Sequence, residues 1–373
     1  MSAGTTIKLS ICIPTLNRGD LIGATLESII CQATDEVEIV IVDGGSTDAT
    51  RQVVGDFQKR FQGIVYFRSD SSSESMSPIP SGSGFDRDCN RAVELSRGEY
   101  CWLFTDDDLF RPGAIESVLK AIRGQYGAVI VNAEARSSDL SHVLDPRTLR
   151  LTSDRLYAET DGQEFFINVA NFLSFVGAVV INRSFWIERS KQEFLGTGLI
   201  HIGVLFQAPI SHGAFVLAEP LVTIRYGNAH YMRSSRYFEI WMFIWPELIW
   251  SFAHFPDSAK RRVCRKEPWR RFRALLAFRA MGAYSMREYE TWLATRLDSN
   301  WSKIVAKVTA LVPGTAANLI IFTWNKLFRN PPEQVYVDLI NSPFYFARIF
   351  TKGSYPSQTL DALEMTNAGR KSA

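Results

Sequence analysis

Three consecutive acids, Asp106, Asp107 and Asp108, stand at the end of an apolar run that begins at Tyr100. Carboxylates at the end of a buried strand repel one another, and burying them costs free energy unless they are paired or bound to a metal. Hard divalent cations such as Mg2+ and Mn2+ prefer oxygen ligands and commonly bind together with phosphate. The acids could equally form an acidic loop that caps a helix starting at Pro112. Taken alone, the cluster leaves both interpretations open.

Two further polar clusters follow predicted strands nearer the N-terminus. The run 9–13 ends at Pro14, Thr15 and Asn17, and the run 38–42 ends at Asp43 to Gly45. Further strands are predicted at 64–67, 100–104 and 128–131, with helical patterns between them. Such alternation predicts parallel strands with crossover helices, and ligands of such sheets bind at the carboxyl ends of the strands. We therefore expect the three polar clusters to meet in one crevice.

The composition is that of a globular protein with a sizeable core. The chain has 373 residues, 46% hydrophobic and 21% charged, and a net charge of +2 that argues against a general nucleic-acid binder. Five cysteines are scattered without a C-x-x-C pair, which favours reduced, mostly buried thiols in a cytosolic protein. Residues 1–8 are short and polar, without the apolar core of a signal sequence.

Three segments together carry a resemblance to a known family. They are Ser10-Ile-Cys-Ile-Pro-Thr-Leu-Asn-Arg18, Glu38-Ile-Val-Ile-Val-Asp-Gly-Gly-Ser-Thr-Asp-Ala-Thr50, and Arg97-Gly-Glu-Tyr-Cys-Trp-Leu-Phe-Thr-Asp-Asp-Asp108 followed by Pro112-Gly113. In this order and spacing they resemble family 2 glycosyltransferases of the GT-A fold, strongly over 8–125 and loosely over 126–230. The chain is most similar to the abequosyltransferase-like type, which builds O-antigen and other surface polysaccharides. The resemblance implies an α/β fold, a Rossmann-like, mostly parallel sheet flanked by helices, with a C-terminal helical appendage.

The resemblance also implies a nucleotide-diphosphate sugar donor, Mg2+ or Mn2+, and inversion at the anomeric carbon by a single displacement. Asp106 would face the ribose and the metal, Asp108 would bind the cation that bridges the two phosphates, and Asp107 would lie beside the donor. Asp43 would meet the nucleoside, with the base as its expected partner. The remaining donor-site residues implied in this half are Pro14, Thr15, Asn17, Arg18 and Gly45.

This sequence departs from the family pattern at two positions. The second acid usual after the second strand is Gly44 here, and the Arg usual before Asn90 is Cys89. Arg87 or Arg91 could reach the phosphates instead, or could belong to a solvated helix face. Asp86 could face the donor sugar or favour the dipole of its own helix.

The acceptor half offers no pair of acids where many relatives have one. His201 stands near the expected place and could accept a proton at neutral pH, and Glu193 is a second candidate base. A lone His in an apolar helix is also a common structural residue. His230 lies in a segment similar to one whose His completes the metal shell in some relatives, which makes it a candidate metal ligand.

A change in composition predicts a catalytic domain over 1–235, a helical region over 236–355 and a disordered tail over 356–373. The donor part of the catalytic domain is expected at about 8–125 and the acceptor part at about 126–235. Aromatic residues crowd 238–255, 259–273 holds eight Lys or Arg and one Glu, and the apolar stretch 301–328 is interrupted by three lysines. Such a mixture suits the surface of a membrane, although a packed appendage or a dimer interface would explain it as well.

The leading hypothesis is a metal-dependent, inverting glycosyltransferase. It would extend a lipid-linked or glycan acceptor in surface polysaccharide synthesis, peripherally bound at the cytoplasmic face of the cytoplasmic membrane, and a homo-oligomer is compatible with this function. The alternative is a non-catalytic nucleotide-sugar-binding or scaffold protein on the same fold. A haloacid-dehalogenase-type phosphatase is disfavoured because its first strand needs a D-x-D run, and Cys12 to Thr15 contain no acid.

Overall fold

The computed structural model describes residues 6–69, 83–228, 234–329 and 331–349. The chain divides into two compact units. Unit 1 comprises Met1–Ala135, Pro146–Arg225 and Leu248–Val263; unit 2 comprises Arg136–Asp145, Tyr226–Glu247 and Cys264–Ala373. The division therefore differs from the predicted boundary at 235, because a short segment after 135 belongs to unit 2 and residues 248–263 return to unit 1.

The first half of the sheet in unit 1 is parallel, as predicted. Strands β3 (Ile64–Arg68), β2 (Val37–Asp43), β1 (Leu9–Thr15) and β4 (Tyr100–Leu103) lie in this order. Both β1 and β2 are completely buried, as expected for strands covered on both faces. The register places Thr15 opposite Asp43, so the polar residues after the two strands begin side by side.

The second half of the sheet is mixed, which the alternation of elements did not predict. After β4 come β9 (Val179–Asn182), β6 (Ala128–Arg136), β10 (Ala214–Arg225) and β5 (Leu109–Phe110). Strand β9 is antiparallel to both β4 and β6, and β10 is antiparallel to β5 and to β8 (Arg155–Tyr157). The twelve-residue β10 returns the chain to the end of the sheet where the acidic cluster lies, since its Val222 and Thr223 pair with β5.

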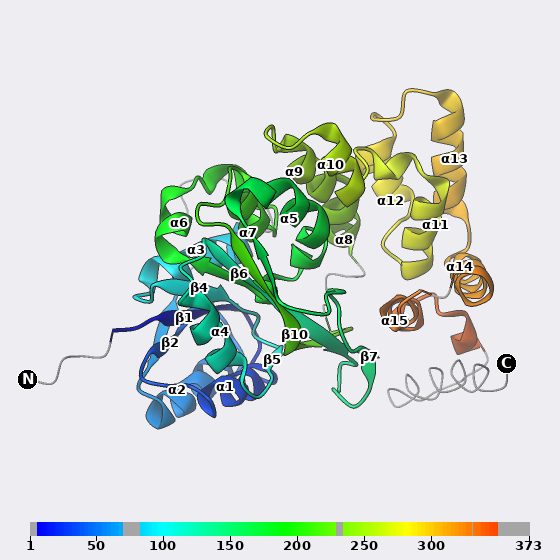
Figure 1. The fold of residues 1–373 in the computed structure, drawn as a ribbon. Helices are drawn as coiled ribbons and strands as arrows, with labels where there is room; N and C mark the ends of the chain where they lie inside the picture. The colour runs from blue at the N-terminus through cyan, green and yellow to red at the C-terminus, as the bar shows by residue number, and fades with distance from the viewer. Residues whose placement is uncertain (1–5, 70–82, 229–233, 330, 350–373) are drawn as a thin grey trace, which may run out of the picture. The chain divides into compact units, whose positions relative to one another are not determined.

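Helices cover both faces of this sheet (Figure 1). Alternate residues of β1, such as Leu9, Ile11 and Ile13, share a core with α1 (Ile22–Ile30), α2 (Thr50–Arg60) and α4 (Ala114–Ile122). The other face meets α3 (Ser83–Leu95). Three thiols on that side, Cys12, Cys89 and Cys101, are fully buried. The remaining helices of unit 1 include α5 (Gly162–Val169), α6 (Arg183–Glu188), α7 (Ile200–Phe206) and α10 (Asp257–Val263).

Unit 2 is helical, as predicted for the C-terminal region. Its elements include β7 (Val143–Asp145), α8 (Ser235–Glu239), a π-helix at Ile240–Ile244, α11 (Phe272–Met281), α12 (Met286–Glu288), α13 (Asn300–Leu311), α14 (Gly314–Phe328) and α15 (Glu333–Asn341), and α9 (Trp245–Ser251) begins in it. Phe238, Phe243, Trp269, Phe278 and Tyr284 form its core. The aromatic run 238–255, expected at a membrane surface, is therefore largely interior: Phe238, Met242, Phe243, Trp245, Leu248, Ile249, Phe252 and Phe255 are all buried.

In the part of the chain that the structure describes, no single helix has the length and apolarity to cross a bilayer. One bent pair, Asn300–Leu311 with Gly314–Phe328, meets that test only jointly, and its two helices are inclined at 99°.

Candidate active site

The acidic cluster is held in place by the last residue of β10. The backbone N–H of Arg225 donates to Oδ1 of Asp108 at 2.7 Å, and Nε of Arg225 donates to the carbonyl oxygen of Asp107 at 3.0 Å. The hydroxyl of Thr105 donates to the other carboxylate oxygen of Asp108 at 2.5 Å, and the hydroxyl of Thr25 donates to the carbonyl oxygen of Asp108 at 2.9 Å. Asp108 is 3% exposed, so its carboxylate is fixed inside the protein.

Burial makes ionisation of these acids unfavourable. It raises the pKa of Asp106 to about 7 and that of Asp108 to about 8, and in both cases the charge of Asp107 adds to the effect. The guanidinium of Arg18, with Nε 3.4 Å from Oδ1 of Asp106, acts in the opposite direction on Asp106. A bound cation would stabilise the ionised form of these two acids, which burial alone makes unfavourable.

The carboxylates of Asp106 and Asp108 fit a cation whose remaining ligands come from water or substrate. Among residues 6–69, 83–228, 234–329 and 331–349, no three His, Cys, Asp or Glu side chains come together as a complete ligand set. Mg2+ is usually bound by one or two carboxylates together with water and substrate phosphates. Asp106 and Asp108 fit this incomplete arrangement, in which phosphate oxygens complete the coordination.

The loops after β1 and β2 are joined by hydrogen bonds. The backbone N–H of Asn17 donates to the hydroxyl of Ser46 at 2.8 Å, and the N–H of Thr47 donates to Oδ1 of Asn17 at 2.8 Å. The N–H of Arg18 donates to the hydroxyl of Thr50 at 2.9 Å. The structure therefore brings the predicted residues Thr15, Asn17, Arg18 and Asp43 together. Pro14 and Thr15 are buried in the last two positions of β1.

Asp43 organises the turn that follows β2. Its Oδ1 accepts hydrogen bonds from the N–H groups of Gly45 and Ser46 at 3.0 and 2.7 Å, and its Oδ2 accepts one from the hydroxyl of Tyr66 at 2.5 Å. The residue is fully buried. Each carboxylate oxygen can accept more than one hydrogen bond, so Asp43 positions the turn and its predicted contact with a nucleotide base stays a prediction.

Gly44 and Gly45 of this turn are favoured for different structural reasons. Gly45 has a φ of +99°, which a residue with a side chain rarely adopts. At Gly44, a Cβ would lie 2.9 Å from Oδ2 of Asp88, a residue of α3. The carboxylate of Asp88 therefore occupies the space beside position 44, where the family pattern has its second acid. Neither Asp88 nor Tyr66 was predicted as a site residue.

Asp86 binds backbone rather than facing the donor. Its Oδ2 accepts a hydrogen bond from the N–H of Gly198 at 2.8 Å and its Oδ1 accepts one from the N–H of Ile200 at 3.2 Å. The residue is fully buried, and it anchors the start of α7 to the first turn of α3. Arg87, the next residue, is half-buried on α3.

The two predicted bases lie in unlike surroundings. His201 is 1% exposed, its Nε2–H donates to the carbonyl oxygen of Leu173 at 2.8 Å, and burial lowers its pKa to about 4. An imidazole enclosed in this way cannot reach an acceptor hydroxyl, so the geometry argues against His201 as the base. Glu193 is exposed, in a 3-10 turn at Gln192–Phe194. His230, the predicted third metal ligand, lies outside the described residues.

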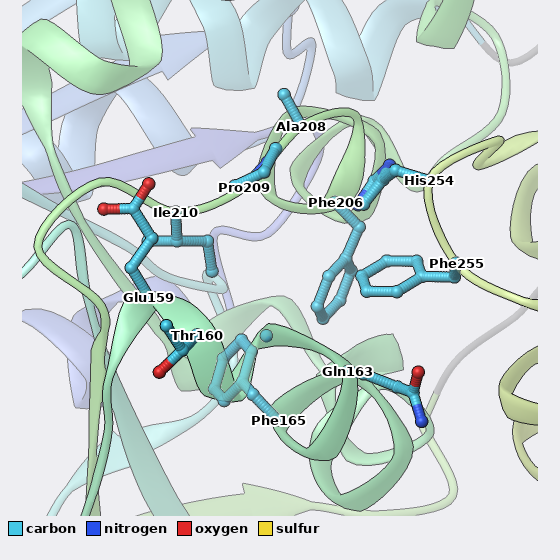
Figure 2. A pocket seen from close by; sticks show the side chains of 11 residues that line it. Glu159, Thr160, Gln163, Phe165, Phe206, Ala208, Pro209, Ile210, His254 and Phe255 are labelled. Atoms are coloured by element: carbon cyan, nitrogen blue, oxygen red, sulfur yellow. The ribbon is translucent and has the colours of Figure 1, made fainter.

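A separate pocket lies at the other end of β10. Figure 2 shows three aromatic rings, Phe165, Phe206 and Phe255, around a hollow with Glu159 and His254 at its edge. It lies beside β8, which pairs with the start of β10, whereas Arg225 is the end of β10. Twelve strand residues extend about 37 Å. The pocket is therefore remote from the acidic cluster and is not the donor site.

Sequence comparison relates the region that holds these residues to a known family. Residues 10–179 match the family model described as Glycosyl transferase family 2. The abequosyltransferase RfbV of Salmonella typhimurium is 22% identical over 240 residues, which cover 61% of this chain and 69% of that protein. A GalNAc(5)-diNAcBac-PP-undecaprenol beta-1,3-glucosyltransferase of Campylobacter jejuni is 30% identical over 125 residues, 34% of this chain and 38% of that protein.

Structural comparison agrees at the level of the fold. The crystal structure of S. aureus TarS 1-349 in complex with UDP has a TM-score of 0.50, 14% identity, and 94% coverage of both chains. The mixed sheet with helices on both faces is therefore the GT-A arrangement predicted from the sequence. Residues 10–179, which match glycosyl transferase family 2, contain the loops after β1 and β2 and the acidic cluster.

Proposed function

We propose that the chain transfers a sugar from a nucleotide-diphosphate sugar with the help of Mg2+ or Mn2+, held by Asp106 and Asp108. The observation that carries this proposal is the buried carboxylate of Asp108, which Arg225 and Thr105 hold by hydrogen bonds. Asp106, two residues earlier, is a second acid whose pKa burial raises. The bound cation would neutralise the charge that develops on the departing nucleoside diphosphate. Asp107, half-buried between Asp106 and Asp108 in the chain, would face the same donor.

The joined loops after β1 and β2 would hold the nucleoside. Asn17 and Arg18 contribute side chains, while Asp43 and Gly45 shape the turn. Arg18 would also balance the charge of Asp106 before the donor binds. Transfer would proceed with inversion by attack of an acceptor hydroxyl on the anomeric carbon, in one displacement.

Glu193 is the base that we propose for this attack. It is exposed, and the segment that follows it is anchored to α3 through Asp86. Arg87, on the same helix turn as Asp86, is the candidate for a contact with the donor phosphates. His201 contributes packing and one backbone hydrogen bond rather than proton transfer.

The acceptor would be a lipid-linked or glycan intermediate of a surface polysaccharide of the O-antigen kind. The similarity to an abequosyltransferase and to a glucosyltransferase named for an undecaprenol-linked substrate supports this class. A lipid-linked acceptor would place the enzyme at the cytoplasmic face of the cytoplasmic membrane as a peripheral protein.

One observation keeps a second candidate function open. The turn after β2 has Gly44 with Asp88 against it, which leaves less room for a base than an open turn would. A non-catalytic protein that binds nucleotide sugars would share the fold and the metal site but would release no free sugar or nucleotide.

A panel of UDP-, GDP-, dTDP- and CDP-sugars, titrated with and without Mn2+, tests the proposal. We expect one nucleotide to bind in Mn2+ and to lose affinity in EDTA, and slow hydrolysis of that donor without acceptor. Unchanged affinity in EDTA would contradict the metal site. Metal-dependent binding without hydrolysis or transfer would favour the non-catalytic alternative.

A further inference from the structure

Helices α13 and α14 each expose several large apolar side chains to solvent. Nine of the fifteen exposed large apolar side chains in the described part of the chain lie on these two helices. They are Trp301, Ile304, Val308, Leu311, Leu319, Ile320, Trp324, Leu327 and Phe328, here named the α13–α14 face. On α13 the spacing of three, four and three residues places its members on one side of the helix. Exposed apolar side chains gathered in this way are typical of an interaction surface.

The orientation of the two helices is fixed by their other sides. Ala306, Thr309 and Ala310 of α13 are buried, as are Ala317 and Phe322 of α14. The side-chain amide of Asn318 donates to the carbonyl oxygens of Ala280 and Leu339 at 3.1 and 2.9 Å, which ties α14 to α11 and α15. The helices therefore cannot turn their apolar side inward without losing an existing core.

The charge around this face is of one sign. Residues 299–332 contain no Asp or Glu, whereas Lys303, Lys307, Lys326 and Arg329 lie within them. The guanidinium of Arg273 lies 5.1 Å from the ring of Trp324. A second copy of this surface would bring like charges together. An anionic surface with an apolar interior complements both features.

The basic run 259–273 is less suited to that role. Lys260 is buried, Arg261 pairs with Asp257, and Arg270 pairs with Glu267 and Asp298. Its charges are therefore partly neutralised within the protein. The sequence-based expectation of a membrane contact covered 238–255, 259–273 and 301–328, and the structure favours the last of these segments.

We propose that the α13–α14 face docks the enzyme on an anionic lipid bilayer. Trp301 and Trp324 would lie at headgroup depth, the aliphatic residues would enter the acyl boundary, and the lysines would meet lipid phosphates. The 99° bend between the helices suits a pair lying in the surface rather than crossing it. The proposal deepens the proposed function, on which it rests for the expectation of a lipid-linked acceptor, by naming the surface that meets the lipid.

The test is co-sedimentation of the full chain with vesicles of phosphatidylcholine alone or with phosphatidylglycerol added. We expect wild type to pellet with the anionic vesicles and to bind neutral ones weakly. Trp301→Ser, Ile304→Ser, Leu327→Ser and Phe328→Ser combined should lower the partition coefficient at least about 100-fold. Lys303→Glu, Lys307→Glu and Lys326→Glu combined should remove the preference for anionic vesicles.

Matched controls change similar residues elsewhere. Leu156→Ser with Ile187→Ser removes two exposed apolar side chains of unit 1, and Arg261→Glu with Arg262→Glu reverses charge in the basic run. Both should bind vesicles as wild type does. All substituted side chains lie outside the cores, and circular dichroism verifies that each variant is folded.

Three results would overturn the proposal: wild type that stays in the supernatant with anionic vesicles, a Ser variant that binds like wild type, or loss of binding only in the Arg261/Arg262 control. A wild-type dimer that the Ser variant converts to monomer, without vesicle binding, would assign the face to self-association. Donor hydrolysis in detergent-free buffer is measured in parallel. Hydrolysis without vesicle binding refutes the docking surface alone, and vesicle binding without hydrolysis refutes the proposed chemistry alone.

Discussion

The acidic cluster of unit 1 and the α13–α14 face of unit 2 are opposite departures from ordinary burial. The first places ionisable carboxylates inside the protein, and Asp108 is 3% exposed. The second places large apolar side chains in water, and Trp301 is 73% exposed. Each is unfavourable in the isolated chain, because desolvated charge and hydrated apolar surface both raise the free energy of the folded state.

The two regions differ in how they are held. The acidic cluster is fixed by directed hydrogen bonds from Arg225, Thr105 and Thr25, which set the positions of single atoms. The apolar face is fixed only through the packing of the opposite helix sides, which sets a surface and no atomic position. A site for chemistry on a small ligand needs the first kind of support, and a site for a fluid lipid surface needs only the second.

The largest expected effect separates chemistry from stability. Asp108→Asn keeps the shape of the side chain but removes its charge, so sugar transfer should fall by at least about 1,000-fold. Vesicle binding through the α13–α14 face should be unchanged. Asp56→Asn, at an exposed acid of α2 paired with Lys59, is the matched control and should retain full activity. A D108N enzyme that retains a tenth of the wild-type rate would remove the metal from the mechanism.

A smaller effect concerns pH and metal. Burial raises the pKa of Asp106 and Asp108 in the folded chain to about 7 and about 8, whereas the ordinary value is 3.8. The folded state therefore binds more protons than the unfolded state above pH 4, and the stability of the metal-free protein should fall as pH rises to about 8. We expect Tm to drop by several degrees between pH 6.5 and 8.5, and added Mn2+ to raise it more at the higher pH, because metal binding requires the ionised acids.

The Asp108→Asn variant is also the control for this pH effect. Asp338 in unit 2, which accepts a hydrogen bond from the hydroxyl of Tyr226, has its pKa raised to about 7 by burial and contributes a slope of the same sign. Only the part of the slope that D108N removes belongs to the acidic cluster. A D108N protein with the same slope as wild type and the same response to Mn2+ would contradict the assignment.

The next effect tests the role of His201. Its ring is buried and neutral at pH 7, so His201→Ala should lower the free energy of unfolding by about 2–4 kcal/mol. Turnover per folded molecule should stay near wild type. Glu193→Gln should show the reverse pattern, with unchanged stability and a rate at least about 100-fold lower. Denaturant titration and initial rates measure both quantities, and a folded H201A enzyme with a 100-fold lower rate would restore His201 as the base.

The smallest effect concerns Gly44. A Cβ at this position would lie 2.9 Å from the carboxylate of Asp88, which can rotate away because it is the end of a side chain. Gly44→Ala should therefore weaken donor binding only about 3- to 10-fold. Adding Asp88→Ala should recover the loss if crowding is its sole cause. If the double variant binds the donor more weakly than G44A does, Asp88 itself contacts the donor.

The sequence predicted the first half of the fold better than the second, for a local reason. Strands β1, β2 and β4 are completely buried, and helices separate the first four strands along the chain, so short apolar runs mark these strands clearly. Strand β9 enters the sheet antiparallel between β4 and β6, and these pairings join residues about 80 and about 50 apart in the chain. No periodicity of the sequence encodes such a neighbour.

The positions of the candidate site residues were predictable where they adjoin strand ends, and less so where other elements support them. Asp106 and Asp108 follow an apolar run, whereas Arg225 contributes a backbone N–H whose partner no motif reveals. Nothing in the sequence distinguishes Asp88 from an ordinary solvent-exposed acid on the surface of α3. The roles of Asp86 and His201 depended on burial, which the helical pattern around them left open. The same limit applied to the segment 238–255, whose aromatic residues suit a core and a bilayer equally.

The positions of the cysteines in unit 1 allow thiol modification to report when α3 separates from the sheet. Cys12, Cys89 and Cys101 are buried between the sheet and α3, while Cys31 is exposed and Cys264 in unit 2 is half-buried. An alkylating reagent would modify Cys31 at once and the three interior thiols only when the sheet parts from α3. Because α3 also carries Asp86, Arg87 and Asp88, the alkylation rate of those thiols reports how often this helix separates from the sheet. Mass spectrometry could then compare the alkylation rates of these thiols with and without a nucleotide-sugar donor.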